Sequence, residues 1–167
     1  MTETKTSRSA HLAGQFEAAQ ESFIRLVESL SDDQWGMTGA NTPELQTNNE
    51  DETRQVRVIA HHVAVTQDWI MNRIKAVLED RPTPPVDFKV INSEHAVEHA
   101  DATKAEVVTL LRDSLGRIAK DLRAIPDEKL DIARELPSGR MSVQERIERV
   151  LIGHMKSHQG SIEATIS

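Results

Sequence analysis

The residues with the clearest potential for chemistry are two histidines near the end of the chain, His154 and His158. Residues four apart on a helix lie on one face about a turn apart, so two imidazoles at this spacing can converge on one ion. Both interrupt an apolar stripe that includes Ile147, Leu151 and Ile162, which predicts that they point inward. A buried imidazole without a partner costs free energy, and either a metal ion or inward hydrogen bonds would remove that cost.

A third ligand is expected from the adjacent pair His61 and His62. Neighbours on a helix differ by about 100° in direction, so only one of the two is expected to face the interior. His62 is in register with Ile59 and Trp69, whereas His61 groups with Asp68 on a more polar side. We therefore predict that His62 is the ligand and that His61 is its solvated neighbour.

A competing motif lies between the second and third predicted helices. The segment His95–His99 matches the H-x-x-E-H arrangement of one class of zinc peptidases, in which both histidines bind zinc and the glutamate is the general base. It follows a proline-rich stretch and has no apolar stripe around it, so a solvated polar connector is the favoured interpretation. His11, near the start of the first helix, is expected at the surface.

The composition excludes several classes of site and partner. There is no cysteine, which rules out disulfides, a thiolate zinc site and a cysteine nucleophile. The net charge of −7 without a dense Lys/Arg cluster, together with only 3% aromatic residues, argues against nucleic acid as a partner. No stretch approaches the roughly 20 apolar residues that span a bilayer, and residues 1–9 lack an apolar signal region. We therefore expect a cytoplasmic location without membrane association.

Four segments have the periodicity of amphipathic helices, and none alternates like a strand. They span about residues 9–30, 53–79, 101–125 and 142 to the end, with capping sequences at Ser31, Thr103 and Ser142. The links are a long polar loop over 36–52, a connector over 86–100 and an irregular segment over 126–140 with a turn at Pro137-Ser138-Gly139. We predict one all-α domain over residues 1–167, a four-helix bundle with long crossover connections.

With these elements placed, the chain resembles the DinB/YfiT-like superfamily of metal-binding helix bundles over almost its whole length. The resemblance is carried by Leu30–Trp35, by Val58–Ala64 with its two histidines, and by His154–Ile162, where two histidines precede a glycine and an aliphatic residue. One departure is the entry to the second helix, where Asn49–Thr53 stands in place of the family's Trp-Ser or Trp-Thr pair.

The resemblance implies a bundle, commonly a homodimer, that holds zinc or nickel through His62, His154 and His158. Water or substrate would take the remaining coordination positions. Three neutral imidazoles with open positions form a catalytic type of metal site, which lowers the pKa of a bound water or thiol.

Two enzyme activities and one non-enzymatic role fit such a site. The family resemblance favours a metal-dependent thiol S-transferase that uses a low-molecular-weight thiol; the alternatives are a metal-dependent hydrolase and a non-catalytic metal- or ligand-binding stress protein. Candidate proton-transfer residues are Asp68 and Glu163, and Arg57 or Lys156 could meet an anionic substrate. We expect all four to be surface charges.

Overall fold

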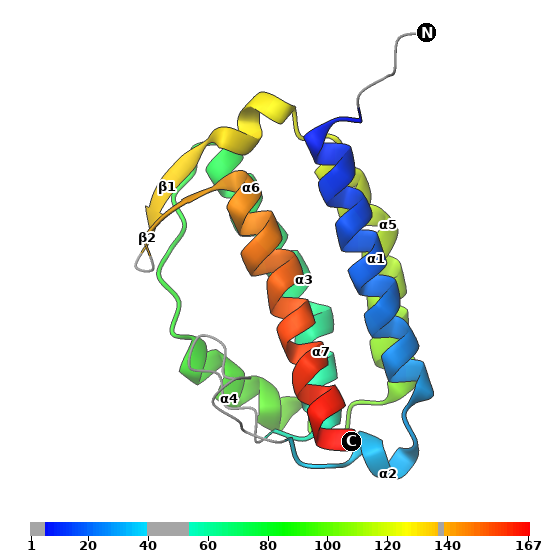
Figure 1. Ribbon diagram of the computed structural model, residues 1–167. Helices are drawn as coiled ribbons and strands as arrows, with labels where there is room; N and C mark the ends of the chain where they lie inside the picture. Colours follow the sequence, from blue (N-terminus) through cyan, green and yellow to red (C-terminus); the bar gives the residue numbers. More distant parts are fainter. Residues whose placement is uncertain (1–5, 40–53, 137–138) are drawn as a thin grey trace, which may run out of the picture.

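The computed structural model describes residues 6–39, 54–136 and 139–167, in which four long helices form a bundle (Figure 1). The long helices are α1 (Arg8–Ser29), α3 (Val56–Leu78), α5 (Lys104–Arg123) and a continuous last helix made of α6 (Val143–Glu145), the π-helical segment η3 (Arg146–Ile152) and α7 (Gly153–Ile166). The shorter elements are α2 (Asp32–Trp35), α4 (Phe88–Glu98), the 3-10 helix η2 (Asp127–Asp131) and the strands β1 (Ala133–Leu136) and β2 (Gly139–Ser142).

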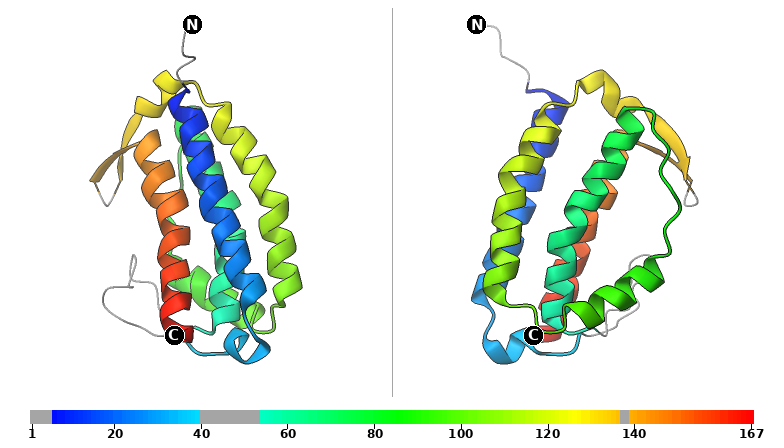
Figure 2. Two further views of the ribbon diagram at one scale, coloured as in Figure 1. Left: turned by 45° about the vertical axis from the view of Figure 1, so that its right-hand side comes forward. Right: turned by 180° about the vertical axis from the view of Figure 1, so that it is seen from behind.

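The order of the helices in the bundle differs from their order in the chain. Helices α1 and α3 each pack against both α5 and α7, so α1 and α3 lie on a diagonal (Figure 2). Helices α3 and α5 run in the same direction, opposite to α1 and α7 (Figure 1). Two parallel neighbours need a connection that returns along the length of the bundle, and the segment 79–103 provides it on the outside (Figure 2). The predicted four-helix bundle with long crossover connections is therefore confirmed.

The apolar stripes read from the sequence form the core. In α1, for example, Phe16, Phe23 and Val27 are fully buried. Helix α3 is more enclosed than its stripe predicts, since 14 of its 23 residues are buried. It is the helix against which α5, α7, η3 and α4 all pack.

A buried polar network joins three of the bundle helices inside this core. The Gln20 side chain donates to the carbonyl oxygen of Leu111 at 2.7 Å and to Ser114 Oγ at 2.8 Å. The Gln67 side chain donates to Gln20 Oε1 at 2.5 Å and accepts from Ser114 Oγ at 3.1 Å. Because each buried polar group has a partner only when α1, α3 and α5 are in register, the network specifies that register.

The predicted caps are confirmed. Ser31 and Ser142 each form a capping box, with Gln34 and Glu145 respectively. The Thr103 side chain accepts from the Glu106 amide at the start of α5. These residues satisfy amide groups that have no partner within their own helix.

Two links contain structure that the sequence analysis did not predict. The connector 86–100 forms helix α4, which begins after Asp87, whose carboxylate accepts from the amides of Lys89 and Val90. The link 126–140 holds η2 and the start of a hairpin in which β1 pairs antiparallel with β2. Strands of four residues are too short to show alternation.

Other predictions fall mainly outside the described part of the chain. Residues 40–53 include most of the predicted polar loop and the departure at Asn49–Thr53, and residues 137–138 include most of the predicted turn. Gly139, which completes that turn, has a positive φ of 110°, a conformation that favours glycine. None of the described helices has the length and apolar character needed to cross a bilayer.

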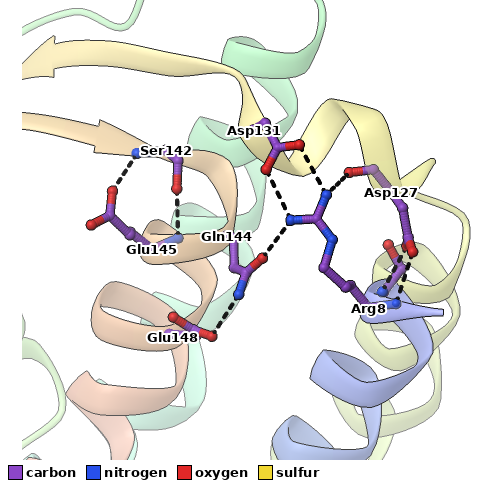
Figure 3. Close-up of polar contacts among 8 residues, drawn as sticks. Arg8, Asp127, Asp131, Ser142, Gln144, Glu145 and Glu148 are labelled. Atoms are coloured by element: carbon purple, nitrogen blue, oxygen red, sulfur yellow. Dashed lines mark hydrogen bonds and ion pairs between the residues drawn. The ribbon is translucent and has the colours of Figure 1, made fainter. Parts of the chain in front are cut away.

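The start of α1 is held by the link that precedes β1. The Asp127 carboxylate accepts from the backbone amides of Arg8 and Ser9 at 2.9 and 3.1 Å (Figure 3). The Arg8 guanidinium binds both carboxylate oxygens of Asp131 at 2.9 Å and also donates to Gln144 Oε1 at 3.0 Å. The backbone hydrogen bonds from Arg8 and then Ser9 hold the pKa of Asp127 below its usual value.

This depressed pKa predicts a pH-dependent contribution to stability. The contribution of ionised Asp127 is fully present above its unfolded pKa of about 4 and is lost as the pH falls through the lower folded pKa. We expect Asp127→Asn to lower the Tm by a few degrees at pH 7 and to have a steadily smaller effect below pH 4, measured by thermal unfolding followed by circular dichroism. Glu128→Gln, an exposed carboxylate on the same turn, is the matched control. A Tm difference that is independent of pH would contradict the assignment.

Candidate metal centre

The three histidines predicted as ligands meet between α3 and α7. The distance from His154 Nε2 to His62 Nε2 is 3.2 Å, and that to His158 Nε2 is 3.0 Å. Each residue offers one ring nitrogen that lies within 4.8 Å of the other two. The predicted convergence of His62, His154 and His158 is thus observed, and we refer to these residues as the first triad.

The local structure of the last helix explains how two of them reach one point. His154 and His158 are one turn apart on α7, directly after the π-helical segment η3. Gly153 donates its amide hydrogen to the carbonyl oxygen of Glu148, and a Cβ at position 153 would lie only 3.2 Å from that oxygen. The glycine therefore permits the close backbone approach at the end of η3, immediately before the first of the two histidines.

Hydrogen bonding alone does not account for the first triad. An imidazole ring nitrogen carries either one proton or one lone pair, so it makes one well-directed hydrogen bond. His154 Nε2 has two imidazole nitrogens within 3.2 Å. A metal ion resolves this arrangement, because three lone pairs can point at one ion. Nitrogens bound to one ion at about 2.0–2.1 Å lie somewhat more than 3 Å from one another, which is close to the separations from His154 Nε2 given above.

Burial leaves one side of the first triad accessible. His62 and His158 are 3% and 0% exposed, whereas His154 is half-buried. Three neutral nitrogen donors suit divalent transition ions such as zinc and nickel, and do not suit calcium or magnesium, which prefer oxygen. The residues therefore fit the kind of ion that the sequence analysis expected.

The prediction for His61 is wrong. This residue is only 2% exposed, although it was expected to be solvated. The inference that only one of His61 and His62 faces the interior assumed that α3 has one buried face. Instead α7 lies on the side of His62, and α4 covers the side of His61, so both imidazoles are enclosed.

The prediction for the His95–His99 segment as a solvated connector is also wrong. His95 lies on α4 and His99 is the residue that caps its C-terminus, and both are half-buried. With His61 they form a second group of three whose ring nitrogens lie within 4.8 Å of one another, the second triad. The side chain of Glu98 is 76% exposed at the edge of this group, where its Oε2 lies 3.8 Å from His99 Nε2. The arrangement therefore lacks the inward general base of the H-x-x-E-H peptidases.

Burial and crowding shape the electrostatics of these rings. Burial, followed by the nearby His62, His61 and His99 rings, lowers the pKa of His95 to about 3. Burial is also the main reason why the pKa of His61 is lowered, and the adjacent Glu106 carboxylate opposes that change. Both imidazoles are therefore neutral at pH 7, the form in which histidine binds metal.

The predicted surface charges lie away from the first triad. Asp68 pairs with Arg117 at 3.1 Å, and Glu163 accepts from the Gln159 side chain at 2.9 Å. Lys156 is exposed and Arg57 is half-buried. Neither carboxylate contributes to either triad.

The comparisons with known proteins agree with this architecture. YfiT from Bacillus subtilis, described as a probable metal-dependent hydrolase with an unusual four-helix bundle topology, superposes with a TM-score of 0.71 at 19% identity, covering 99% of this chain and 90% of that one. An uncharacterised protein from Clostridium difficile 630 gives a TM-score of 0.63 at 10% identity, covering 93% and 94%. The sibling lethal factor precursor DfsB gives 0.60 at 16% identity, covering 95% and 94%.

These likenesses show the fold. A comparison with curated proteins gave no match. The family model of the DinB superfamily matches residues 15–162, which include all six histidines of the two triads. The chain therefore belongs to the DinB superfamily.

Proposed function

We propose that the first triad binds a divalent ion, zinc or nickel, and that the protein is a metal-dependent thiol S-transferase acting on a low-molecular-weight thiol. The observation that carries the proposal is the convergence of three Nε2 atoms on one point, with His154 Nε2 within 3.2 Å of both others. A divalent ion bound there would lower the pKa of a thiol or water at its open positions and so supply a nucleophile at neutral pH.

The donor set favours an anionic partner at the open positions. His62, His154 and His158 are neutral when they act as ligands, and among the described residues no carboxylate joins their group. The protein therefore leaves the charge of a divalent ion uncompensated, which favours a thiolate as the next ligand. The half-buried side of His154 is where a small molecule could enter.

The surroundings of the first triad favour thiol transfer over attack by water. A free thiol has a pKa of about 8.5 and water one of about 15.7, so a bound ion has to lower the pKa of a thiol far less to supply a nucleophile at neutral pH without a neighbouring base. The nearest ring outside the triad is His95, whose ring centroid is 5.8 Å from that of His62. A pKa of about 3 keeps His95 neutral and makes it a weak base at pH 7.

A metal-dependent hydrolase is the second candidate. The observation that favours it is the shared fold with YfiT, which is described as a probable metal-dependent hydrolase. Fold likeness does not establish chemistry. The two candidates share the same ligands and differ in whether thiol or water is the nucleophile.

The first test concerns the ligands. In protein purified without a nickel affinity step, we expect His154→Ala/His158→Ala to lose one equivalent of metal per chain relative to the wild type, measured by inductively coupled plasma mass spectrometry. His11→Ala, which removes an exposed histidine of α1, should keep the wild-type content. If the double variant keeps all of its metal, His154 and His158 are not ligands.

The second test separates thiol from water. We expect glutathione, cysteine or 2-mercaptoethanol to add a sulfur-to-cobalt charge-transfer band to the near-ultraviolet spectrum of the Co²⁺-loaded protein. The band must come from the added thiol because the chain has no cysteine. It should be absent from His154→Ala/His158→Ala. A spectrum unchanged by every thiol would contradict S-transfer and leave hydrolysis as the better candidate.

A homodimer is the proposed assembly, since the family is commonly dimeric. Sedimentation equilibrium should then give a mass close to twice the 18.7 kDa of the chain. A mass equal to that of one chain, at micromolar concentration with and without Zn²⁺, would contradict it.

A further inference from the structure

The first triad leaves half of the histidine cluster unexplained. Six of the seven histidines of the chain belong to one of the two triads, and ring contacts link them into one cluster. We infer that His61, His95 and His99 form a second divalent transition-metal site, with the Glu106 carboxylate orienting His61. This site goes beyond the proposed function, and its observations do not depend on the first triad.

The positions of the three rings define the site. His61 Nδ1 lies 2.8 Å from His95 Nε2, and the His99 ring stacks on that of His61 with centroids 3.9 Å apart. His95 lies on α4 and His99 caps the C-terminus of that helix, where its amide donates to the carbonyl oxygen of His95 at 3.0 Å. Their ring centroids are 4.8 Å apart. One ring nitrogen from each of the three residues lies within 4.8 Å of the other two. Small rotations of the rings would bring all three to one ion.

Glu106 supplies the contact that a metal-binding imidazole usually makes with its other nitrogen. Its Oε1 faces His61 Nε2 at 3.5 Å, from the first turn of α5. A proton on Nε2 would point at the carboxylate and leave the lone pair on Nδ1, the atom that faces His95. A carboxylate behind a histidine ligand fixes the tautomer and makes the ligand more basic.

A hydrogen bond between His61 and His95 explains less of what is observed. That bond would engage one nitrogen of each ring and leave His99 as a bystander. An ion would draw together all three rings, which explains why three imidazoles gather at the contact between α3 and α4.

The charges around the second triad also favour a cation. Glu106 lies beside His61, and Glu98 Oε2 is 3.8 Å from His99 Nε2, so two carboxylates lie at the edge of the second triad. Nitrogen donors select ions such as zinc, nickel or copper over calcium and magnesium. His61 and His62 are adjacent on α3, and the His62 and His95 ring centroids are 5.8 Å apart, so the two triads are neighbours.

The test is a count of metal ions per chain. Apoprotein prepared with a chelator is titrated with Zn²⁺ by isothermal titration calorimetry, and the bound metal is then measured by mass spectrometry. We expect two equivalents for the wild type, one for His95→Ala/His99→Ala and one for His154→Ala/His158→Ala. The double substitution in α4 should not unfold the bundle, because α4 has no buried residue in the core. Circular dichroism checks this point.

Two matched controls and one positioning variant sharpen the result. His11→Ala and Glu94→Gln should both keep two equivalents, since His11 is exposed on α1 and Glu94 is an exposed carboxylate of α4. Glu106→Gln should keep two equivalents but weaken the second one by about 10- to 100-fold, the usual effect of losing a carboxylate behind a histidine ligand.

The outcomes for the two triads are distinguishable. One equivalent in the wild type that His95→Ala/His99→Ala retains, or two equivalents in that variant, would overturn the second site and leave the first untouched. Two equivalents in His154→Ala/His158→Ala would overturn the first triad, while loss of one in His95→Ala/His99→Ala would still support the second.

Discussion

The burial of imidazole rings is the constraint on which the rest of this structure depends. Rings from α3, α4 and α7 meet in one cluster, and three of them are almost fully enclosed. A buried polar group without a partner costs about 1–3 kcal/mol, so a cluster of this size is tenable only if its nitrogens are shared with one another, with a carboxylate or with an ion. The helices around the cluster are arranged so that each buried ring lies next to another ring or a carboxylate.

Helix α3 is central to that arrangement. It carries His61 and His62 on adjacent faces, and it is buried on most of its circumference. One face is covered by α7, which brings His154 and His158, and the other by α4, which brings His95 and His99. Neither triad exists within one helix: each combines one histidine of α3 with a pair spaced four apart on another element.

The topology is what makes this possible. A bundle of antiparallel helices joined by short loops would place α3 next to α1 and would leave no long segment between α3 and α5. Because α3 and α5 are parallel, the chain must return along the outside, and the returning segment has room for α4 (Figure 2). The polar network of Gln20, Gln67 and Ser114 holds α1, α3 and α5 in register from the inside. At one end of the bundle, the contacts of Arg8 with η2 tie the start of α1 to the link that precedes the last helix (Figure 3). The last helix changes to π-helical geometry before His154, a feature often found near functional sites.

The sequence by itself determined the features that depend on local periodicity. The four stripes predicted the four long helices to within about three residues at their described ends, and the caps at Ser31, Thr103 and Ser142 were found as expected. The spacing of His154 and His158 predicted a shared inward face, and the register of His62 selected it as their partner. These predictions succeeded because a helical period of 3.6 residues fixes which side chains share a face.

Only the tertiary structure decided which faces are covered. His61 lies on what the sequence presents as a polar side of its helix, and His95 and His99 lie in a segment with little apolar periodicity, so none of them appeared to be buried. The spacing of four between His95 and His99 was visible in the sequence. The periodicity of a helix, however, does not specify which other element packs against it. That depends on the crossover, which carries α4 back beside α3, and on Glu106, which reaches His61 from a helix 45 residues further along the chain. The second triad is therefore a product of the topology, whereas the first was already indicated by the spacing of its residues.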